Sequence, residues 1–357
     1  MVQLGIQPEK TARKGPLVTL ITINYNSMSK LEIILTCLKS VLELQWRPLQ
    51  LVYIDNGSTD QSFSKIQEFA KQNAPEDIDL IFLPLRANLG FAKGNNEGLR
   101  ASDPSSKYIV ILNNDLAPKP YSLNRLVEFL ESHSDFAGVQ PVVMCWDDAE
   151  IDSAGGVFTF WGASGIAKGL PKWYAKEPFL VSHVYGAYSV YRKSAIERAG
   201  GLFLPDFFMY GDDYELGVRL WSNGYKLAAL PVDGGRHYVS ATTGMSGTSA
   251  YFSMRNETSV LVMYSGTFSF LVITRSIGVV GYSFAKRRRG AARAFIDGLV
   301  FGREMRKNMP RKMKNAMKYV PRPNFSFTDF VFMHSRLRSS TQFQKNLSDR
   351  ITNSYNL

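Results

Sequence analysis

Residues 17–55 read LVTLITINYNSMSKLEIILTCLKSVLELQWRPLQLVYID, and this stretch decides the expected fold. Two short runs rich in β-branched residues, 17–25 and 49–55, flank a segment of helical character between Lys30 and Leu44. A strand, a helix and a second strand in this order predict a βαβ unit, in which the two strands lie parallel in one sheet.

The same alternation continues to about Val239. Beyond the first unit, a capping-box pattern at Ser58–Gln61 predicts the start of a helix that continues to about Lys71. A strand over 78–85, a helix over 92–101 and a strongly apolar strand over 107–115 follow. The expected fold class is therefore α/β with a mainly parallel sheet.

The composition limits the class of protein. The 357 residues are enough for one large core, or for one core with a smaller appendage. Cys37 and Cys145 have no cysteine or histidine partner at metal-ligand spacing, so neither a disulfide framework nor a structural zinc site is expected. The polar residues 1–15 lack the apolar core of a signal peptide, and we expect a flexible arm and a cytoplasmic protein.

The net charge of +11 comes from one segment of the chain. Between Lys286 and Arg322 there are 13 lysine and arginine residues and 2 acids, and the remainder of the chain is neutral. Such a localised basic run favours attachment to anionic lipid headgroups, with a solvated basic face as the alternative. No nucleic-acid-binding motif accompanies it, so nucleic acid is not an expected partner.

Residues 246–357 differ in character from the α/β domain expected over 16–245, and a Gly/Ser/Thr-rich linker near 244–250 separates the two. Residues 258–285 carry a single charge, Arg275, which raises the question of a membrane span. A single span would place the domain and the basic run on opposite sides, against the positive-inside rule. We therefore expect a helical basic region that lies on the inner face of the cell membrane, and leave a homodimer through this region open.

Polar residues recur at the carboxyl ends of the predicted strands, where an open parallel sheet has its ligand crevice. They are Asn24, Asn26, Asp55, Asn88 and Asp115. Asp55 is able to accept a hydrogen bond from a nucleobase N–H, and Asp115 to hold a divalent cation against diphosphate oxygens. His237 is able to complete that site. Taken alone, Asp55 and Asp115 could equally belong to ordinary turns at the ends of strands. His237 could equally be a structural histidine.

Two aspartates, Asp212 and Asp213, stand where the segment 204–225 (LPDFFMYGDDYELGVRLWSNGY) is expected to begin a helix. Adjacent carboxylates raise each other's pKa when they are buried, which suits a general base. Acids that only complement the helix dipole are the alternative. For Glu215 we expect this dipole-complementing role, or a structural salt bridge with Arg219, four residues further along the helix.

Five segments occur in the order and approximate spacing seen in family 2 glycosyltransferases. They are ITINYN, VYIDNGSTD, ANLGFAKGNNEG, ILNND and FFMYGDDYELGVR. Over about residues 17–244 the chain resembles that family, and looks closest to its rhamnosyltransferase-like and galactofuranosyltransferase-like branches. The resemblance implies a GT-A fold and a metal-assisted, inverting transfer from a nucleoside-diphosphate sugar to a glycan or lipid-linked acceptor, in polysaccharide biosynthesis of the cell envelope.

The same resemblance implies roles for single residues. Asp213 would be the catalytic base with Asp212 beside it, and Asp115 and His237 would hold Mg²⁺ or Mn²⁺. The expected donor-site residues are Asn24, Asn26, Asp55, Asn88, Gly90 and Asn114. The metal motif reads NND rather than the more common DXD, which leaves a metal-sparing variant open. The base motif has Asp212 where many members have glutamate.

Three other classes of function compete with this interpretation. A noncatalytic nucleotide-sugar or glycan-binding protein of the same fold would have no need of Asp213. A nucleic-acid-binding protein would carry a recognition motif beside the basic run. A nucleotidyltransferase would need a glycine-rich, basic triphosphate loop near the amino terminus, and residues 22–27 (TINYNS) contain neither glycine nor lysine.

Overall fold

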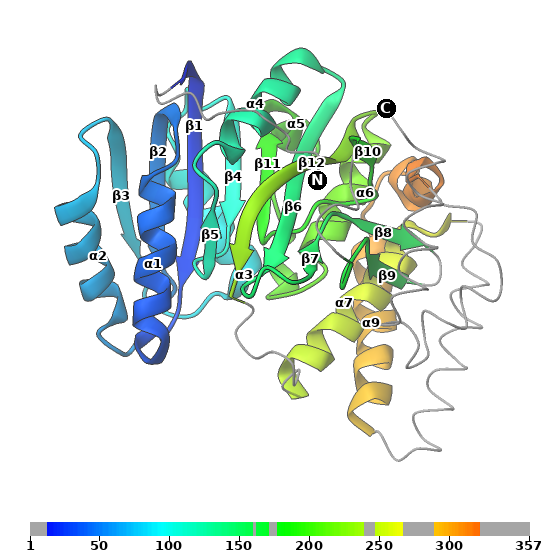
Figure 1. Ribbon diagram of the computed structural model, residues 1–357. Coiled ribbons are helices and arrows are strands. Elements are labelled where there is room, and N and C mark those ends of the chain that lie inside the picture. The colour runs from blue at the N-terminus through cyan, green and yellow to red at the C-terminus, as the bar shows by residue number, and fades with distance from the viewer. Residues whose placement is uncertain (1–12, 160–161, 171–176, 239–246, 267–288, 322–357) are drawn as a thin grey trace.

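A computed structural model of the chain describes residues 13–159, 162–170, 177–238, 247–266 and 289–321 (Figure 1). Residues 1–12 of the expected arm, residues 239–246 and residues 267–285 of the uncharged stretch lie outside the described residues, as does the chain beyond residue 321. Of the linker expected near 244–250, residues 247–250 are described, and they belong to a helix. The domain boundary near residue 245 therefore stays a prediction.

The first part of the chain alternates between strands and helices, as the sequence predicts. In order the elements are β1 (Arg13–Asn24), η1 (Met28–Lys30), α1 (Leu31–Leu42), β2 (Trp46–Asp55), α2 (Ser62–Asn73), β3 (Ile78–Pro84), α3 (Gly90–Ala101) and β4 (Tyr108–Leu112). In α1 the buried residues Ile34, Cys37, Leu38 and Val41 recur every three to four positions, so they form one apolar face of the helix.

The second part of the chain has shorter and more varied elements. They are β5 (Leu116–Pro118), α4 (Ser122–Ser132), β6 (Phe136–Cys145), β7 (Ile151–Ser153), β8 (Gly156–Thr159), β9 (Gly162–Gly165), β10 (Phe179–Leu180), β11 (Tyr188–Arg192), α5 (Lys193–Arg198), η3 (Pro205–Phe207), α6 (Asp212–Ser222) and β12 (Lys226–His237). The C-terminal region contributes α7 (Gly247–Tyr264), α9 (Arg289–Lys307) and η5 (Met313–Tyr319).

The central sheet has the strand order β10-β12-β6-β11-β4-β1-β2-β3. The four strands β4, β1, β2 and β3 are parallel, which agrees with the predicted βαβ arrangement. β11 enters antiparallel to both of its neighbours, β4 and β6. The sheet as a whole is therefore mixed, and its parallel character is concentrated in the N-terminal half.

Helices cover both faces of this sheet (Figure 1). One core contains residues of α1, α2 and α4, and the other contains residues of α3, α5, α6 and α7. Neighbouring strand residues alternate between them: Leu20 and Val110 belong to the first core, and Ile21, Ile109 and Ile111 to the second. This double burial explains why the strands read as continuous apolar runs.

Two sequence-based boundaries are wrong. The helix predicted to begin with a capping box at Ser58–Gln61 begins at Ser62. Its first N–H donates to Asp60 Oδ1 at 3.0 Å, and Ser58 does not cap it. Ser58 Oγ instead accepts a hydrogen bond from the Asn26 N–H at 2.9 Å. The strand predicted over 107–115 ends at Leu112, because the chain turns there before β5. Both differences lie where the strands give way to the site.

The C-terminal helices pack on the α/β core. Leu261 and Tyr264 of α7 and Met317 of η5 lie in the same buried cluster as Leu216 and Leu220 of α6. Figure 1 shows α7 and α9 side by side below the second half of the sheet. None of the described helices combines the length and the apolar character that crossing a membrane requires.

Candidate active site

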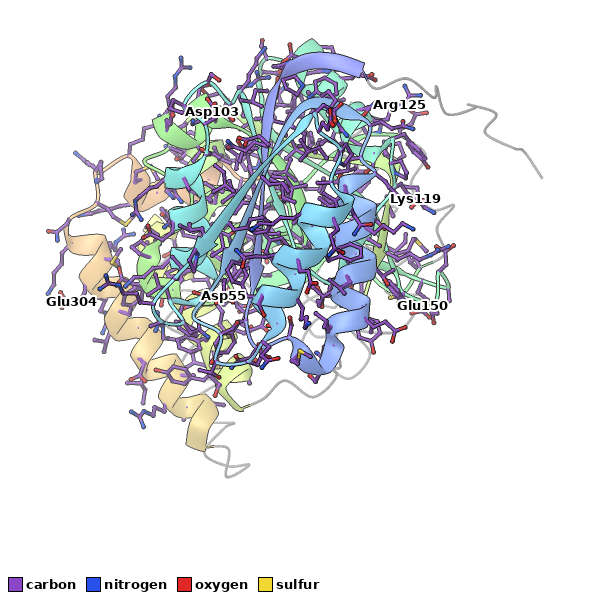
Figure 2. The ribbon with its side chains drawn as sticks, turned by 90° about the vertical axis from the view of Figure 1, so that its left-hand side faces the viewer. Asp55, Asp103, Lys119, Arg125, Glu150 and Glu304 are labelled. Carbon is purple, nitrogen blue, oxygen red and sulfur yellow. The ribbon has the colours of Figure 1, made fainter. Side chains whose placement is uncertain are left out.

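Asn24 and Asp55 are register partners at the ends of the parallel strands β1 and β2. Figure 2 shows Asp55 at this carboxyl edge of the sheet and Asp103 at the opposite edge. Asn24 is buried, and its Nδ2 donates to Asp55 Oδ1 (3.3 Å) and Ser62 Oγ (3.0 Å), while its Oδ1 accepts from Asn114 Nδ2 (3.3 Å). Asn24 is therefore the hydrogen-bonding centre of this end of the sheet.

The loops that follow β1 and β2 are tied to each other. Asn26 is exposed and has a left-handed backbone conformation, with φ 44°. Its Oδ1 accepts from the Thr59 N–H at 2.7 Å. Ser58 donates its backbone N–H to Asp55 Oδ2 at 3.0 Å, so the Asp55 carboxylate is held from its own loop as well. These contacts fix one wall of the predicted donor site.

Asn88 and Gly90 lie at the start of α3, and Asn56 connects them to the first loops. Asn88 Oδ1 accepts from the Gly90 N–H (2.8 Å) and from Asn56 Nδ2 (3.0 Å). Gly90 has φ +79°, and a Cβ there would lie 2.4 Å from the carbonyl oxygen of Phe208. Only glycine permits this close approach, which brings the segment before α6 against the predicted donor site.

Asp115 and His237 meet because β5 pairs with β12, with Leu116 opposite His237. His237 Nε2 lies 3.1 Å from Asp115 Oδ1, and Nδ1 lies 2.9 Å from Asp152 Oδ2 of β7. Burial lowers the pKa of His237, but its hydrogen bonds with the two carboxylates outweigh burial and raise the pKa to about 9. The sequence analysis did not single out Asp152, because its segment carries no motif and lies far from His237 along the chain.

The chemistry of the pair Asp115 and His237 fits a divalent cation. A histidine that binds a metal ion with one nitrogen almost always donates its other N–H to a carboxylate, a backbone carbonyl or water, and Asp152 occupies that position beside His237. Within the described ranges, no group of three or more histidine, cysteine, aspartate or glutamate side chains is arranged to hold a metal ion. Two protein ligands leave the other positions to phosphate oxygens and water, as is usual for Mg²⁺ at phosphate sites.

Asp212 and Asp213 begin α6, as the sequence predicts. Asp212 is 3% exposed, and its buried Oδ2 has no hydrogen-bond partner among the described residues. Burial and the neighbouring charge of Asp213 raise the pKa of Asp212 well above its usual value. Asp213 is half-buried, accepts the Tyr214 N–H at 2.8 Å, and has its pKa raised to about 6 by burial. Such a carboxylate is ionised at neutral pH and still basic enough to accept a proton.

The residues just before α6 have unusual backbone conformations. The Met209 N–H donates to the Phe207 carbonyl at 2.7 Å, which makes Phe208 (φ 63°, ψ −62°) the centre of a γ-turn with positive φ. Tyr210 (φ 61°) and Gly211 (φ 86°) also have positive φ. Conformations of this kind cost about 1–3 kcal/mol for each non-glycine residue and persist only where neighbouring structure holds them.

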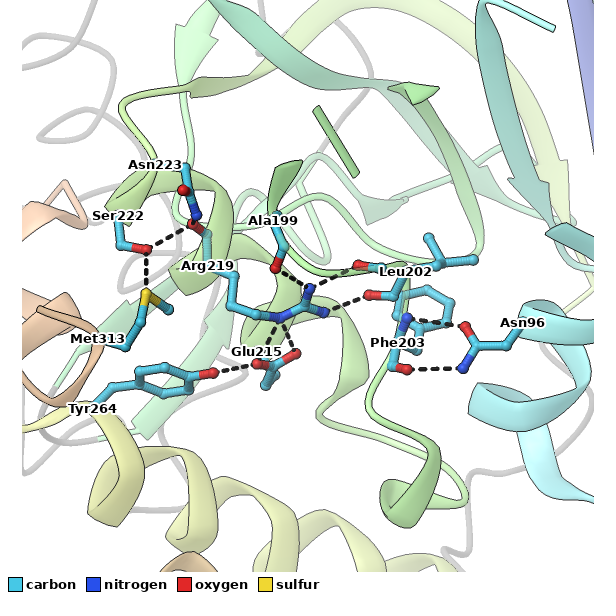
Figure 3. Close-up of polar contacts among 11 residues, drawn as sticks. Asn96, Ala199, Leu202, Phe203, Glu215, Arg219, Ser222, Asn223, Tyr264 and Met313 are labelled. Carbon is cyan, nitrogen blue, oxygen red and sulfur yellow. Dashed lines mark hydrogen bonds and ion pairs between the residues drawn. The ribbon is translucent and has the colours of Figure 1, made fainter. Parts of the chain in front are cut away.

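The predicted pair Glu215–Arg219 is confirmed, and it is buried (Figure 3). Arg219 Nε donates to Glu215 at 2.8 Å, and Nη1 donates to the carbonyls of Ala199 (3.0 Å) and Gly201 (2.7 Å). Tyr264 of α7 donates its hydroxyl to the same carboxylate. Glu215 therefore has a structural role: its carboxylate binds Arg219 within α6 and connects α6 to Tyr264 of α7.

Comparison with solved structures defines the class of protein. The chain aligns with GalNAc-T7, solved with UDP, GalNAc and Mn²⁺, with a TM-score of 0.58 and 16% identity over 90% of this chain and 58% of that one. It aligns with S. aureus TarS 1-349 with a TM-score of 0.51 and 13% identity over 94% and 91% of the two chains. The fold is that of the GT-A glycosyltransferases.

Sequence comparison gives the family. The model of "Glycosyl transferase family 2" matches residues 19–200, so this chain belongs to that family and is a glycosyltransferase. It is 25% identical to the N-acetylglucosaminyl-diphospho-decaprenol L-rhamnosyltransferase of Mycobacterium tuberculosis over 250 residues, 64% of this chain and 78% of the relative. It is 33% identical to an uncharacterized glycosyltransferase of Nostoc sp. over 122 residues, 34% of this chain and 35% of the relative.

Proposed function

We propose that this glycosyltransferase moves a sugar from a nucleoside-diphosphate donor to a hydroxyl of a lipid-linked glycan, with inversion and with Asp213 as the general base. The observation that carries the proposal is the acidic start of α6. The loop before it packs against Gly90 of the predicted donor site through the Phe208 carbonyl, and burial raises the pKa of Asp213 to about 6. The acceptor class is supported by the name of the mycobacterial relative, which gives its acceptor as N-acetylglucosaminyl-diphospho-decaprenol.

The reaction is a direct displacement at the anomeric carbon. The acceptor oxygen forms the new bond to that carbon as the bond to the diphosphate oxygen breaks, and the diphosphate leaves with the electron pair. Asp213 takes the proton of the acceptor hydroxyl. Asp55 accepts a hydrogen bond from the nucleobase, while Asn24, Asn26, Asn88, Gly90 and Asn114 shape the donor site around it.

Asp115 and His237 would hold Mg²⁺ or Mn²⁺ beside the diphosphate. The bound cation would neutralise the charge of the departing diphosphate. Asp152 keeps His237 in the orientation that presents Nε2 to the site. Support comes from the carboxylate and imidazole donor set of the pair and from the Mn²⁺ in the GalNAc-T7 structure.

The test is release of nucleoside diphosphate from a panel of nucleotide sugars, with and without Mg²⁺ or Mn²⁺, in the presence of lipid-linked acceptors. We expect one donor to react, and the Asp213→Asn variant to lose roughly 10²–10⁴-fold in rate. Asp206→Asn is the matched control, since Asp206 is an exposed acid seven residues before Asp213. Equal rates for Asp213→Asn and the wild type would exclude Asp213 as the general base. If no nucleotide sugar of the panel releases nucleoside diphosphate, the noncatalytic alternative is favoured.

The outer face of α9 is our proposed contact with an anionic membrane surface on the cytoplasmic side. Ile296 (47% exposed) and Val300 (55%) lie on it together with Arg293, Arg303 and Lys307, all at spacings of three or four residues. Apolar side chains flanked by basic ones are typical of helices that lie in a membrane interface. Three basic residues of the run predicted over Lys286 to Arg322 therefore lie on one amphipathic face of α9.

Sedimentation with anionic vesicles tests this contact. The variant Arg293→Gln/Arg303→Gln/Lys307→Gln should bind them more weakly, because each basic residue near such a surface contributes about 1 kcal/mol. Arg100→Gln, on the exposed side of α3, is the control. Unchanged sedimentation of the triple variant would exclude α9 as the contact.

A further inference from the structure

Asn256 of α7 contacts the strained loop that precedes the two aspartates of α6. It is fully buried, and its Nδ2 donates to three carbonyl oxygens of that loop: Phe207 (2.9 Å), Met209 (3.0 Å) and Tyr210 (2.7 Å). The orientation of the amide follows from its chemistry, because a flipped Asn256 would turn its own oxygen against three acceptors.

The loop is held from its other side by α3. The carbonyl oxygen of Phe208 accepts the N–H groups of Phe91 (2.6 Å) and Ala92 (3.2 Å) at the start of that helix. The Phe208 carbonyl thus points toward α3, whereas the carbonyls before and after it point toward Asn256. Gly211 completes the arrangement, since a Cβ on it would lie 2.9 Å from the Cβ of Asn256.

Other residues of α7 tie this helix to the same region. Arg255 Nη2 donates to the carbonyl of Asp206 at 2.6 Å, and its guanidinium lies over the ring of Phe301, 4.7 Å from the ring centroid. Tyr264 donates to Glu215, one turn of α6 beyond the loop. α7 therefore contacts the chain on both sides of the aspartate pair.

We propose that Asn256 is a positioning residue for the sugar transfer: its side-chain amide holds the loop over 207–211 in its strained form and so sets where Asp213 stands. The proposal rests on the proposed function of Asp213. The two N–H groups of one buried amide, shared among three carbonyl oxygens, hold a conformation that Phe208 and Tyr210 would not adopt by themselves. It follows that the C-terminal region, beyond the part matched by the family model, supplies a functional residue of the transferase site.

The test compares Asn256→Ala and Asn256→Asp with Ser259→Ala. Asn256→Asp keeps the shape and replaces the donors with acceptors, so it separates hydrogen bonding from packing. Ser259 is buried one turn further along α7 and bonds to the carbonyl of Gly298 in α9 without touching the loop, so its variant controls for weaker packing of α7. We expect both Asn256 variants to lose roughly 10–100-fold in kcat/KM, since small misplacements of a reacting group have effects of this size.

Two readouts separate positioning from general loss of structure. Hydrogen exchange should accelerate in the peptide spanning 206–213 and at the amides of Phe91 and Ala92, and should not change in β1 or β2. In Asn256→Ala the acid limb of the pH profile should move below pH 6, because a loosened loop lets water reach the Asp213 carboxylate and lowers its pKa. The other titratable groups around Asp213 are Asp212, Tyr214 and Glu215 on α6 and Tyr191 on β11, and none is altered.

The outcomes are distinct. The proposal is overturned if hydrogen exchange over 206–213 is unchanged in the Asn256 variants, or if it is faster while kcat/KM stays unchanged. It is also overturned if Ser259→Ala loses as much kcat/KM as the Asn256 variants do. If the wild-type chain transfers no sugar while the loop exchanges faster in both Asn256 variants, the proposed function fails and the holding of the loop by Asn256 stands.

Discussion

The two ends of the site differ in how their polar groups are satisfied. At the ends of β1 and β2, Asn24 and Asp55 share a dense set of hydrogen bonds with the serines of the next loop. At the start of α6, Asp212 is buried with an unpaired carboxylate oxygen, and Phe208 and Tyr210 have strained backbones. The first end is stable by its own local contacts, whereas the second depends on α7.

This difference agrees with the roles proposed for the two ends. A donor site has to be in place before the nucleotide arrives, and local hydrogen bonds organise it at little cost. A general base needs a raised pKa, and burial next to a second carboxylate supplies it at the expense of stability. The comparison predicts that substitutions at the two ends change stability in opposite directions.

The largest expected effect on stability is at Arg219. Replacing Arg219 with alanine leaves the buried Glu215 without its ion partner and frees the carbonyls of Ala199 and Gly201. We expect the free energy of unfolding to fall by about 3–5 kcal/mol. Denaturant unfolding measures it, with Arg100→Ala, in an exposed pair, as the control. A loss below about 1 kcal/mol would show that α6 is held mainly by its apolar face.

Asp152→Ala tests the support of His237. The substitution removes the carboxylate that fixes His237 Nδ1, 2.9 Å away, and leaves Asp115 in place. We expect Mn²⁺ affinity, measured by electron paramagnetic resonance with nucleoside diphosphate present, to fall roughly 10–100-fold. Asp148→Ala, which breaks an exposed pair with Arg236, should bind Mn²⁺ as the wild type does. If both variants bind Mn²⁺ with the same affinity, Asp152 does not contribute to the metal site.

Asn24→Ala tests the end of the site at β1 and β2, where the polar groups are hydrogen-bonded. The substitution leaves acceptors on Asp55 and Ser62 without their buried donor. We expect a loss of about 1–3 kcal/mol in the free energy of unfolding and weaker binding of the donor nucleotide, seen by calorimetry. An exposed asparagine on α2, Asn73, provides the control variant Asn73→Ala. Stability equal to that of the wild type would mean that water replaces Asn24 at this edge.

Asp212→Asn should have the smallest effect and the opposite sign. Because the pKa of Asp212 is raised in the folded chain, ionising its buried carboxylate costs stability. This cost begins as the pH rises past the ordinary pKa of an unfolded aspartate and is complete above the raised pKa. We expect the neutral variant to be more stable by about 0.5–2 kcal/mol at neutral pH, with the gain vanishing as the pH falls toward 4. Thermal unfolding across pH checks this. A variant less stable than the wild type at pH 7 would contradict the comparison.

The sequence predicted the N-terminal half of the fold well because that half is built from regular βαβ units. The apolar runs of β1, β2 and β4 and the helical face of α1 are local signals. The antiparallel entry of β11 was not predicted, since nothing in a single strand's sequence states its direction. Helix starts were less certain, and Ser58 bonds to another loop instead of capping α2.

Part of the candidate site also follows from sequence. Asn24, Asp55 and Asp115 could be named because the carboxyl ends of parallel strands lie at one edge of a sheet. Asp152 and Asn256 could not be named, because each acts on residues far away in the chain, His237 and the loop before α6. Neither residue lies in a motif, so only the packing of β7 and α7 reveals them.

By itself, the sequence determined the class of fold, the family, the confinement of the positive charge to one segment and the acids at the start of α6. Each of these rests on residue order, local periodicity or composition. The tertiary structure alone decided that Glu215 is buried against Arg219 while Asp212 has an unpaired oxygen, and that Asn256 holds the loop before them. The physical reason is that burial and hydrogen-bond satisfaction depend on which distant segments meet, and these determine pKa and strain.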